Sequence, residues 1–503
     1  MTRIIRYSCT LVAGIVWLCS TAVAQSYHQV GTIVYPYRAV PAIAQSGNRF
    51  DILFNNRRSQ SIDSVVLKGT YWNVRLESDS VHSGRFEYDS LTRMYVNTII
   101  RAGVPTDAPE ELYDLVVYCG GESFVSKRSV KVVKSFPARH KFIHITDTHV
   151  SRNWIGEAGN GYAKELELLD KFIDVANIIA PDFVVVTGDL THDYTRFNAD
   201  SREWGGTLIK KYDQLPTEEE KFKNYYEGAK GFRGVQGIDA PVFSVPGNHD
   251  FYGMKENDYL NKCMQWNSIS GKRVYAVSFA GTRLLGADDF LGDPVNDKLS
   301  RAPMSVRQRQ VFDGFLKDAG SGQLRIMAKH SHRHFDTAFL NKNNIQLVLT
   351  GHSHTPGIDT LGTTPSISMR PGVVCRSGEL EGWEKRLGFF RIFYVDGGNF
   401  QYTAPLRFCS NPTAAYKNLD LNLLLSFSNN NTGISVSNTA TLTNKFPVDL
   451  PGCRVRFVMK KGKYRIDNGV IRQVVNTDKF TVIDVNVDLK AGDLKRIKIE
   501  TDK

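Results

Sequence analysis

The chain has few cysteines and no disulfide framework. Seven occur among 503 residues, and those beyond residue 24 are Cys119, Cys263, Cys375, Cys409 and Cys453. This odd, widely scattered set excludes a disulfide-rich scaffold, and none of its intervals has zinc-knuckle spacing. The sequence permits at most two disulfide bridges and leaves their pairing open, so the fold must depend on hydrophobic cores.

Long uncharged apolar runs are also scarce. The run at the N-terminus, Leu11 to Trp17, is too short to anchor a chain in a bilayer. Arg3 and Arg6 precede it and Ala22-Val23-Ala24 follows it, which is the pattern of a secretory signal peptide with its cleavage site. We therefore expect residues 1–24 to be a signal peptide, and an exported protein, periplasmic or extracellular, without a transmembrane segment.

Dense basic blocks are absent as well. The formal net charge is +11, and it falls to +9 without Arg3 and Arg6, but the lysines and arginines are scattered. No basic run interleaved with aromatic residues marks a nucleic-acid groove. The positive excess can steer an anionic substrate, and a solvated basic surface explains it equally well.

Three rhythms of secondary structure divide the rest of the chain, whose length fits two to four domains. Residues 25–136 alternate short strands with turn residues, which predicts an N-terminal immunoglobulin-like β-sandwich. Residues 410–503 return to strands and predict a C-terminal β domain. The strands expected in these two regions include Phe50–Phe54, Ile62–Lys68, Met94–Ile100, Leu112–Tyr118, Ser129–Val133, Leu421–Phe427, Ile434–Val436, Arg454–Met459, Val482–Val487 and Leu494–Ile499.

Residues 137–409 change to strand, loop and helix, which predicts an α/β core with helices outside. Helices are expected over Tyr162–Ile179, around Phe222–Tyr226 and over Ser305–Ala319. Fully apolar strands are expected where both faces of a sheet are covered. The expected strands are Phe142–Ile145, Phe183–Val186, Val242–Val245, Arg325–Ala328, Ile345–Leu349, Phe389–Val395 and Phe400–Ala404.

Polar residues that suit metal ions follow five of these strands. In chain order the clusters are Asp147-Thr148-His149, Gly188-Asp189, Gly247-Asn248-His249-Asp250, His330 and Gly351-His352-Ser353-His354. Because open α/β sheets place their active sites at the carboxyl ends of strands, we expect the clusters to meet. The i, i+2 spacing lets alternate side chains of an extended loop converge on one ion. Asp, Asn and His donors suit Mn, Fe, Zn or Ni.

This order of blocks resembles the calcineurin-like metallophosphoesterases over about Ala138 to Phe408. The resemblance implies a four-layer α/β sandwich, a metal-dependent phosphoesterase and two divalent metal ions as cofactors. The implied ligands are Asp147, His149 and His354 for one metal and Asn248, His330 and His352 for the other, with Asp189 bridging both.

The same resemblance gives His249 a role other than metal binding. It would stabilise the developing charge and protonate the leaving oxygen, while a hydroxide held between the metals attacks phosphorus. Asp250 either orients that imidazole or stabilises the turn. Arg152, Asn153 and His192 are candidate substrate contacts, with surface or turn-capping roles as the alternatives.

Several alternatives stay open. His330 comes first after its strand, and His332 and His334 are the other candidates in that cluster. Asp288 and Asp289 follow a further strand and are interpreted as helix-capping or loop carboxylates. The purple acid phosphatase branch has a similar domain order, but it places a tyrosine ligand where this chain has His192.

We therefore expect phosphoester hydrolysis, with phosphodiesters favoured and phosphomonoesters as the close alternative. A surface binding protein that retains an idle metal core is a second class, and its β domains would contact a glycan or the cell surface. A nuclease is a third possibility, although the scattered charge gives no positive reason for long nucleic-acid contact.

Overall fold

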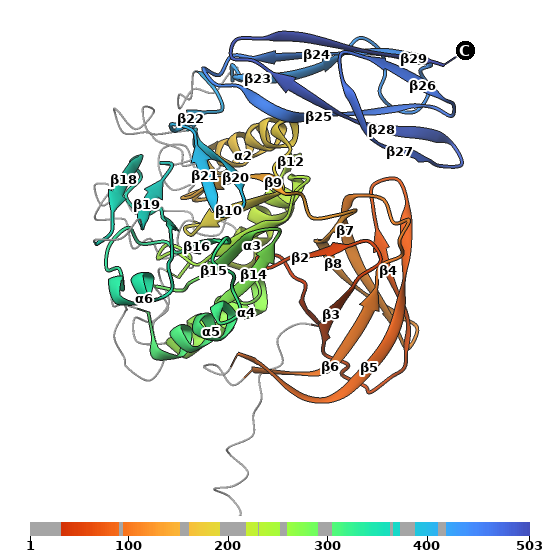
Figure 1. The fold of residues 1–503 in the computed structure, drawn as a ribbon. Coiled ribbons are helices and arrows are strands. Elements are labelled where there is room, and N and C mark those ends of the chain that lie inside the picture. Colours follow the sequence, from red (N-terminus) through yellow and green to blue (C-terminus); the bar gives the residue numbers. More distant parts are fainter. Residues whose placement is uncertain are drawn as a thin grey trace, which may run out of the picture.

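The structure is a computed structural model that describes residues 32–89, 94–150, 160–191, 218–229, 231–251, 259–289, 304–362, 366–372, 388–410 and 419–502. The expected signal peptide lies outside these ranges. The described residues form an N-terminal β region, a central α/β region and a C-terminal β region that lie against one another (Figure 1). No helix within the described ranges is long and apolar enough to cross a membrane.

The N-terminal region is a set of strands in the order β1-β3-β6-β5-β4-β7-β8-β2. Strand β5 takes part in two sheets, because residues 73–76 pair with β4 and residues 77–89 pair with β6. Inward side chains such as Ile52, Ile100 and Leu115 form one apolar core. The strands are β1 (Ile33–Tyr35), β2 (Ala42–Gln45), β3 (Arg49–Phe54), β4 (Ile62–Lys68), β5 (Asn73–Asp89), β6 (Met94–Gly103), β7 (Glu111–Cys119) and β8 (Glu122–Val133). The immunoglobulin-like topology stays a prediction.

The central region contains two sheets of six strands each. One has the order β13-β10-β9-β20-β21, with β22 beside β20, and the other has the order β14-β15-β16-β17-β19-β18. The strands are β9 (Arg139–Ile145), β10 (Phe183–Thr187), β13 (Val242–Val245), β14 (Tyr275–Phe279), β15 (Thr282–Gly286), β16 (Leu324–Ala328), β17 (Leu347–Leu349), β18 (Gly357–Thr360), β19 (Ile367–Arg370), β20 (Phe389–Asp396), β21 (Asn399–Tyr402) and β22 (Leu406–Arg407), with a short pair β11 (Gly228–Ala229) and β12 (Phe232–Arg233) apart from them.

Helices flank these sheets, and the first, second and fourth of those named below lie where the sequence predicts helices. They are α2 (Asn160–Ile179), α3 (Glu218–Glu227), α4 (Tyr259–Ile269), α5 (Val306–Leu316) and α6 (Thr337–Lys342), with a 3-10 turn η4 (Val235–Gly237). Ser305 caps α5, since its hydroxyl accepts a hydrogen bond from the Gln308 amide. The α/β class is confirmed, while the four-layer arrangement stays a prediction.

The parallel strands bring their carboxyl ends to one side. Strands β9, β10 and β13 are parallel in the first sheet, and β15, β16 and β17 are parallel in the second. The two sets adjoin, because β10 contacts β16 and β13 contacts β15. Every residue of β10 is buried, as expected for a strand covered on both faces. Loops that leave these strand ends therefore share one edge of the core.

The C-terminal region consists of a four-stranded sheet, β23-β24-β29-β26, and a three-stranded sheet, β25-β28-β27. Its strands are β23 (Leu423–Phe427), β24 (Ser437–Asn444), β25 (Leu450–Lys460), β26 (Tyr464–Asp467), β27 (Val470–Asn476), β28 (Phe480–Leu489) and β29 (Leu494–Thr501).

The predicted strand Ile434–Val436 is wrong. These residues lie in a turn, Ile434 is 67% exposed, and β24 begins only at Ser437. Asparagine side chains hold the turn, because the Asn431 amide group donates to the Arg456 carbonyl.

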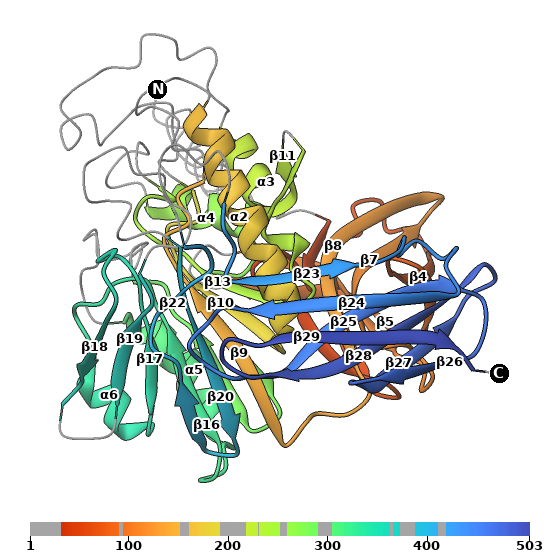
Figure 2. The same ribbon diagram turned by 90° about the horizontal axis from the view of Figure 1, so that it is seen from above.

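Helix α2 lies between the central sheet and the C-terminal region (Figure 2). Its residues Leu166 and Ile173 share one side, and Leu168 and Val175 lie on the opposite side, yet all four are fully buried. Strands β23 and β25 contact the helix. In a helix exposed to solvent on one side, that side is polar. In α2 it is apolar, and the C-terminal region covers it.

Ion pairs join all three regions. Asp239, just after η4, pairs with Arg128 of β8 and Arg454 of β25. Arg456 of β25 also lies 3.3 Å from the Glu111 carboxylate of β7. The cysteines within the described ranges, Cys119, Cys263, Cys409 and Cys453, are buried free thiols.

Candidate metal centre

The five clusters of metal-ligand residues meet at the shared strand edge. Asp147 and His149 follow β9, Asp189 follows β10, and Asn248 follows β13. His330 follows β16, and His352 and His354 follow β17. Backbone hydrogen bonds tie the loops together, because the Asp147 amide donates to the Gly188 carbonyl and the Gly351 amide donates to the His330 carbonyl.

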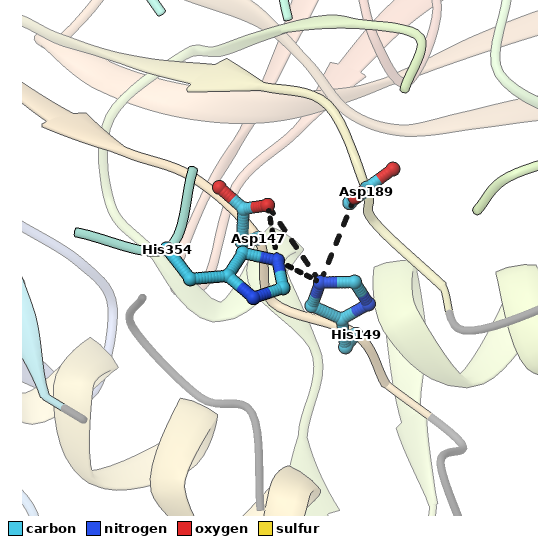
Figure 3. Close-up of side chains that lie close together, drawn as sticks. All are labelled: Asp147, His149, Asp189 and His354. Atoms are coloured by element: carbon cyan, nitrogen blue, oxygen red, sulfur yellow. Dashed lines mark hydrogen bonds and ion pairs between the residues drawn. The ribbon is translucent and has the colours of Figure 1, made fainter. Parts of the chain in front are cut away.

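A first group of side chains comprises Asp147, His149, Asp189 and His354, whose possible ligand atoms all lie within 4.8 Å of one another (Figure 3). His354 Nε2 lies 3.0 Å from Asp147 Oδ1 and 3.1 Å from His149 Nε2. His149 Nε2 lies 3.6 Å from both Asp147 Oδ1 and Asp189 Oδ2. The imidazole nitrogens and carboxylate oxygens thus point at one common space.

A second group comprises Asp189, His330 and His352. His330 Nε2 lies 3.1 Å from Asp189 Oδ2 and 3.1 Å from the amide oxygen of Asn248. His352 Nδ1 lies 3.0 Å from the same Asn248 oxygen. Asp189 belongs to both groups, so its carboxylate lies between two sets of donors, and its bridging of two metals stays a prediction.

The loops are not extended, contrary to our expectation. Asp147, His149, Asp189, His352 and His354 all have left-handed backbone angles, with φ between 47° and 67°. Such a conformation costs about 1–3 kcal/mol for a non-glycine residue and is concentrated at functional sites. The tight curvature, rather than alternation along an extended loop, turns both members of each i, i+2 pair towards the centre.

Neighbouring glycines allow this close packing. A Cβ at Gly247 would overlap the amide and the carboxylate of Asp189, and a Cβ at Gly351 would overlap Thr146 and Asp147. Gly188 has φ +82°, and a Cβ there would meet the His330 ring. The glycines in the sequence motifs are therefore required by close approach of backbone and ligand side chains.

The donor set fits divalent cations. Asp147 and Asp189 are fully buried, and imidazole nitrogens of His354 and His330 lie at hydrogen-bonding distance from Asp147 Oδ1 and Asp189 Oδ2. Two buried carboxylates are unfavourable unless positive charge, from protonated imidazoles or from a cation, neutralises them. Carboxylate, imidazole and amide donors of this kind suit Mn, Fe, Zn or Ni.

Electrostatics around the centre keep both carboxylates ionised. Burial raises the pKa of Asp147, but His354 and His149 outweigh burial and hold that pKa well below its usual value. Burial likewise raises the pKa of Asp189, and His330 and His249 bring it below the usual value. Burial lowers the pKa of His330, but Asp189 raises it to about 10.

His249 lies beside the two groups without belonging to either. Its ring is 4.7 Å from the His149 ring, centroid to centroid, and nearly perpendicular to it. Its backbone amide donates to Asp189 Oδ1 at 2.8 Å, which fixes the residue against the shared carboxylate. The side chain thus lies next to the donors of the first group.

Asp250 stabilises the turn that carries His249. Its Oδ2 accepts the Gly247 amide at 2.8 Å, and its Oδ1 accepts the Thr191 amide at 2.9 Å. Burial, followed by the nearby Asp189, raises the pKa of Asp250 to about 7. Of the two sequence interpretations, the contacts favour the turn-stabilising one.

Two further candidate histidines, His332 and His334, belong to neither donor group. His332 is outside both groups, with its ring 5.8 Å from the His352 ring, and His334 is exposed. Arg152, Asn153 and His192 lie outside the described residues. A cavity of about 290 Å³ that Gln323, Arg325 and Gln346 line lies at the amino ends of β16 and β17, on the opposite side from the metal centre.

One partner of the ligands was invisible in the sequence. His330 Nδ1 lies 2.6 Å from the backbone carbonyl of Thr187, the last residue of β10. This contact turns Nε2 towards Asp189 and Asn248, as backbone carbonyls commonly do for metal-binding histidines. Because the acceptor is a main-chain atom, no residue type could have signalled it.

Comparison with known proteins supports a phosphoesterase. Residues 140–356 match a family model described as calcineurin-like phosphoesterase, and this span contains every candidate ligand. The comparison with curated proteins gave no match.

Two solved structures with low overall similarity also match. A predicted phosphoesterase from Streptococcus pneumoniae TIGR4 is 14% identical, covers 54% of this chain and 91% of its own, and gives a TM-score of 0.23. PhoD is 10% identical, covers 80% of this chain and 91% of its own, and gives a TM-score of 0.43.

Proposed function

From the premise that residues 140–356 form a calcineurin-like phosphoesterase domain, part of a metal-dependent hydrolase, we propose that the chain hydrolyses phosphodiesters with His249 as proton donor. The observation that carries the proposal is the pair of donor groups that share Asp189, with His249 beside them but in neither. A set of donors without such a neighbour would bind metal but would lack a group to protonate the leaving oxygen.

We assign the donors to two metal positions. Asp147, His149 and His354 would hold one cation, and Asn248, His330 and His352 would hold the other. Asp189 would contribute to both. When bound, the two cations supply Lewis acidity that lowers the pKa of a water nucleophile and offsets the charge of the phosphate.

His249 would act on the leaving group. The residue is 7% exposed, and its ring lies next to that of His149. It can therefore reach a phosphoester bound at the centre while bulk water is largely excluded. The amide contact with Asp189 and the turn that Asp250 stabilises hold the imidazole in place. A protonated His249 would stabilise the developing negative charge and give its proton to the departing oxygen.

Diester substrates are the finer part of the proposal. The pair of Asp147 and His149 in the first group supports diester substrates. In the family that this chain resembles, the phosphodiesterase-like branches have such an Asp-x-His pair. Bis-p-nitrophenyl phosphate and p-nitrophenyl phosphate separate the two substrate classes. A higher kcat/KM for the diester supports the proposal, and a clear preference for the monoester replaces it with a phosphomonoesterase.

The test of His249 uses metal content and turnover together. We expect His249→Ala to retain two metal equivalents by elemental analysis and to lose about 10²- to 10⁴-fold in kcat, since it removes only the proton donor. His334→Ala is the matched control, because His334 is an exposed histidine of a nearby loop. Loss of metal in His249→Ala would contradict the assigned role.

A further inference from the structure

A buried ion pair lies directly beside the second donor group. Asp289 follows β15 and Lys329 follows β16, and each residue is 5% exposed. Lys329 Nζ lies 3.1 Å from Asp289 Oδ2. From sequence, Asp289 is interpreted as a helix-capping or loop carboxylate, and its contacts show a more specific arrangement.

The Asp289 carboxylate holds the backbone that carries His330. Its Oδ1 accepts the His330 amide at 3.3 Å, and its Oδ2 accepts the Ser331 amide at 3.0 Å. Two successive amides that point at one carboxylate restrict the peptide between them. The start of the loop is thus fixed from the β15 side.

Lys329 fixes the other end of the same loop. Its ammonium donates to the carbonyls of Arg333, at 2.9 Å, and His334, at 3.4 Å. The aromatic ring of Phe335 lies 4.6 Å from Nζ. The ion pair therefore closes the loop of residues 329–334 on itself and against β15.

The rest of His330 is held from the first sheet and from β17. Its carbonyl accepts the Gly351 amide, and its Nδ1 lies against the Thr187 carbonyl. Its backbone amide donates to Asp289. A small rotation of this peptide would move Nε2 away from Asp189 and Asn248, which lie 3.1 Å from it.

We infer that Asp289, paired with Lys329, is a positioning residue: it holds His330 in place for the metal that His330, His352 and Asn248 would bind. This inference rests on the proposed metal assignment. Burying two charges is expensive, and replacing such a pair by apolar residues is often neutral or stabilising. Stability alone therefore gives a weak reason for the pair, whereas fixing a ligand-bearing loop gives a direct one.

Asp288, the residue before Asp289, provides a matched control. It is also buried, at 1% exposure, and its carboxylate pairs with the guanidinium of Arg273. Arg273 in turn lies 3.3 Å from Asp89 at the end of β5. Asp288 thus serves the contact with the N-terminal region, so an Asp-to-Asn change there removes a comparable buried charge without releasing His330.

The experiment titrates metal-free protein with Mn²⁺ alone and measures stoichiometry, affinity and thermal midpoint. We expect Asp289→Asn to bind its second Mn²⁺ about 10- to 100-fold more weakly than wild type while binding the first normally. Asp288→Asn should lower the midpoint and keep both affinities. Two wild-type affinities in folded Asp289→Asn would overturn the inference.

A second variant covers poor folding of Asp289→Asn. Lys329→Gln removes the ion pair and can still donate to the loop carbonyls, and we expect it to weaken the same Mn²⁺. Unchanged binding in folded Lys329→Gln would overturn the role of the pair. Metal binding is measured separately from catalysis. A wild-type protein that binds two Mn²⁺ and cleaves no phosphoester would contradict the proposed function and leave the role of Asp289 intact.

Discussion

Two histidines of β9 are buried and belong to neither donor group. His140 Nε2 lies 2.9 Å from the Thr282 hydroxyl, and His144 Nε2 lies 2.9 Å from the Thr187 hydroxyl. Burial lowers the pKa of His140 to about 4 and that of His144 to about 3. Both rings are therefore neutral in the folded protein at pH values where an unfolded histidine is already charged.

The lowered values predict acid sensitivity. An unfolded histidine binds a proton below about pH 6.5, whereas the folded rings do not, so their contribution to stability is complete above 6.5 and falls as the pH drops. Each ring should remove about 1.4 kcal/mol per pH unit between about 6.5 and its folded pKa, which is about 4 for His140 and about 3 for His144. Guanidinium unfolding at pH 7.5 and 5.0 measures the loss. A double variant, His140→Gln with His144→Gln, should show a smaller loss than wild type, and an equal loss would contradict the assignment.

The residue types of the centre could be predicted, but its local geometry could not. Ligand-type residues after apolar strands indicated which side chains meet, because strand ends converge in an α/β sheet. The left-handed angles at Asp147 and His352 have no signal in these residue types. The carbonyl of Thr187 and the contacts of Asp289 likewise carry no sequence pattern.

At the scale of elements, the glycine-containing turns decide how closely the loops approach. We expect Gly247→Ala to displace Asp189, because the added methyl group would overlap its amide and carboxylate. The variant should lose bound metal and at least about 10²-fold in activity.

Gly314 in α5 is the matched position, since an added Cβ there meets nothing within 4 Å. Gly314→Ala should keep both metals and raise the free energy of unfolding by about 0.5–1 kcal/mol, because alanine favours a helix. Metal analysis and urea unfolding check both variants. Normal metal content in Gly247→Ala would show that the loop has room to move.

Apolar patterns in the sequence predicted most helices and strands, whereas polar strands were not predicted. Strand β5 has 17 residues, and most of them are polar and exposed. Its pairing with both β4 and β6 stabilises it, and that is tertiary information. The error at Ile434–Val436 has the opposite cause, because β-branched residues there occupy an asparagine-held turn.

At the scale of the whole molecule, Asp239 joins regions that are far apart in sequence. Arg128 and Arg454, its partners, lie 111 and 215 residues away. Burial raises the pKa of Asp239, but Arg454 and Arg128 outweigh burial and hold it well below the usual value. No local pattern could have identified these partners.

This arrangement predicts that Asp239→Asn loosens the flanking regions. We expect a loss of about 1 kcal/mol in stability, a modest value because the side chain is a third exposed and its charges are partly screened. The difference from wild type should shrink in 1 M NaCl. Asp396→Asn, which breaks the exposed pair with Arg139, should have almost no effect. Thermal unfolding at low and high salt checks both, and equal effects would contradict the role of Asp239.

The cover over α2 also sets an order of events on the ribosome. The helix ends at Ile179, and β25, which packs on it, begins at Leu450, about 270 residues later. At ordinary translation speeds, roughly 14–54 s pass between the two. During that time the nascent chain presents an uncovered apolar helix. The central region can therefore complete its packing against β23 and β25 only when these late segments of the chain are present.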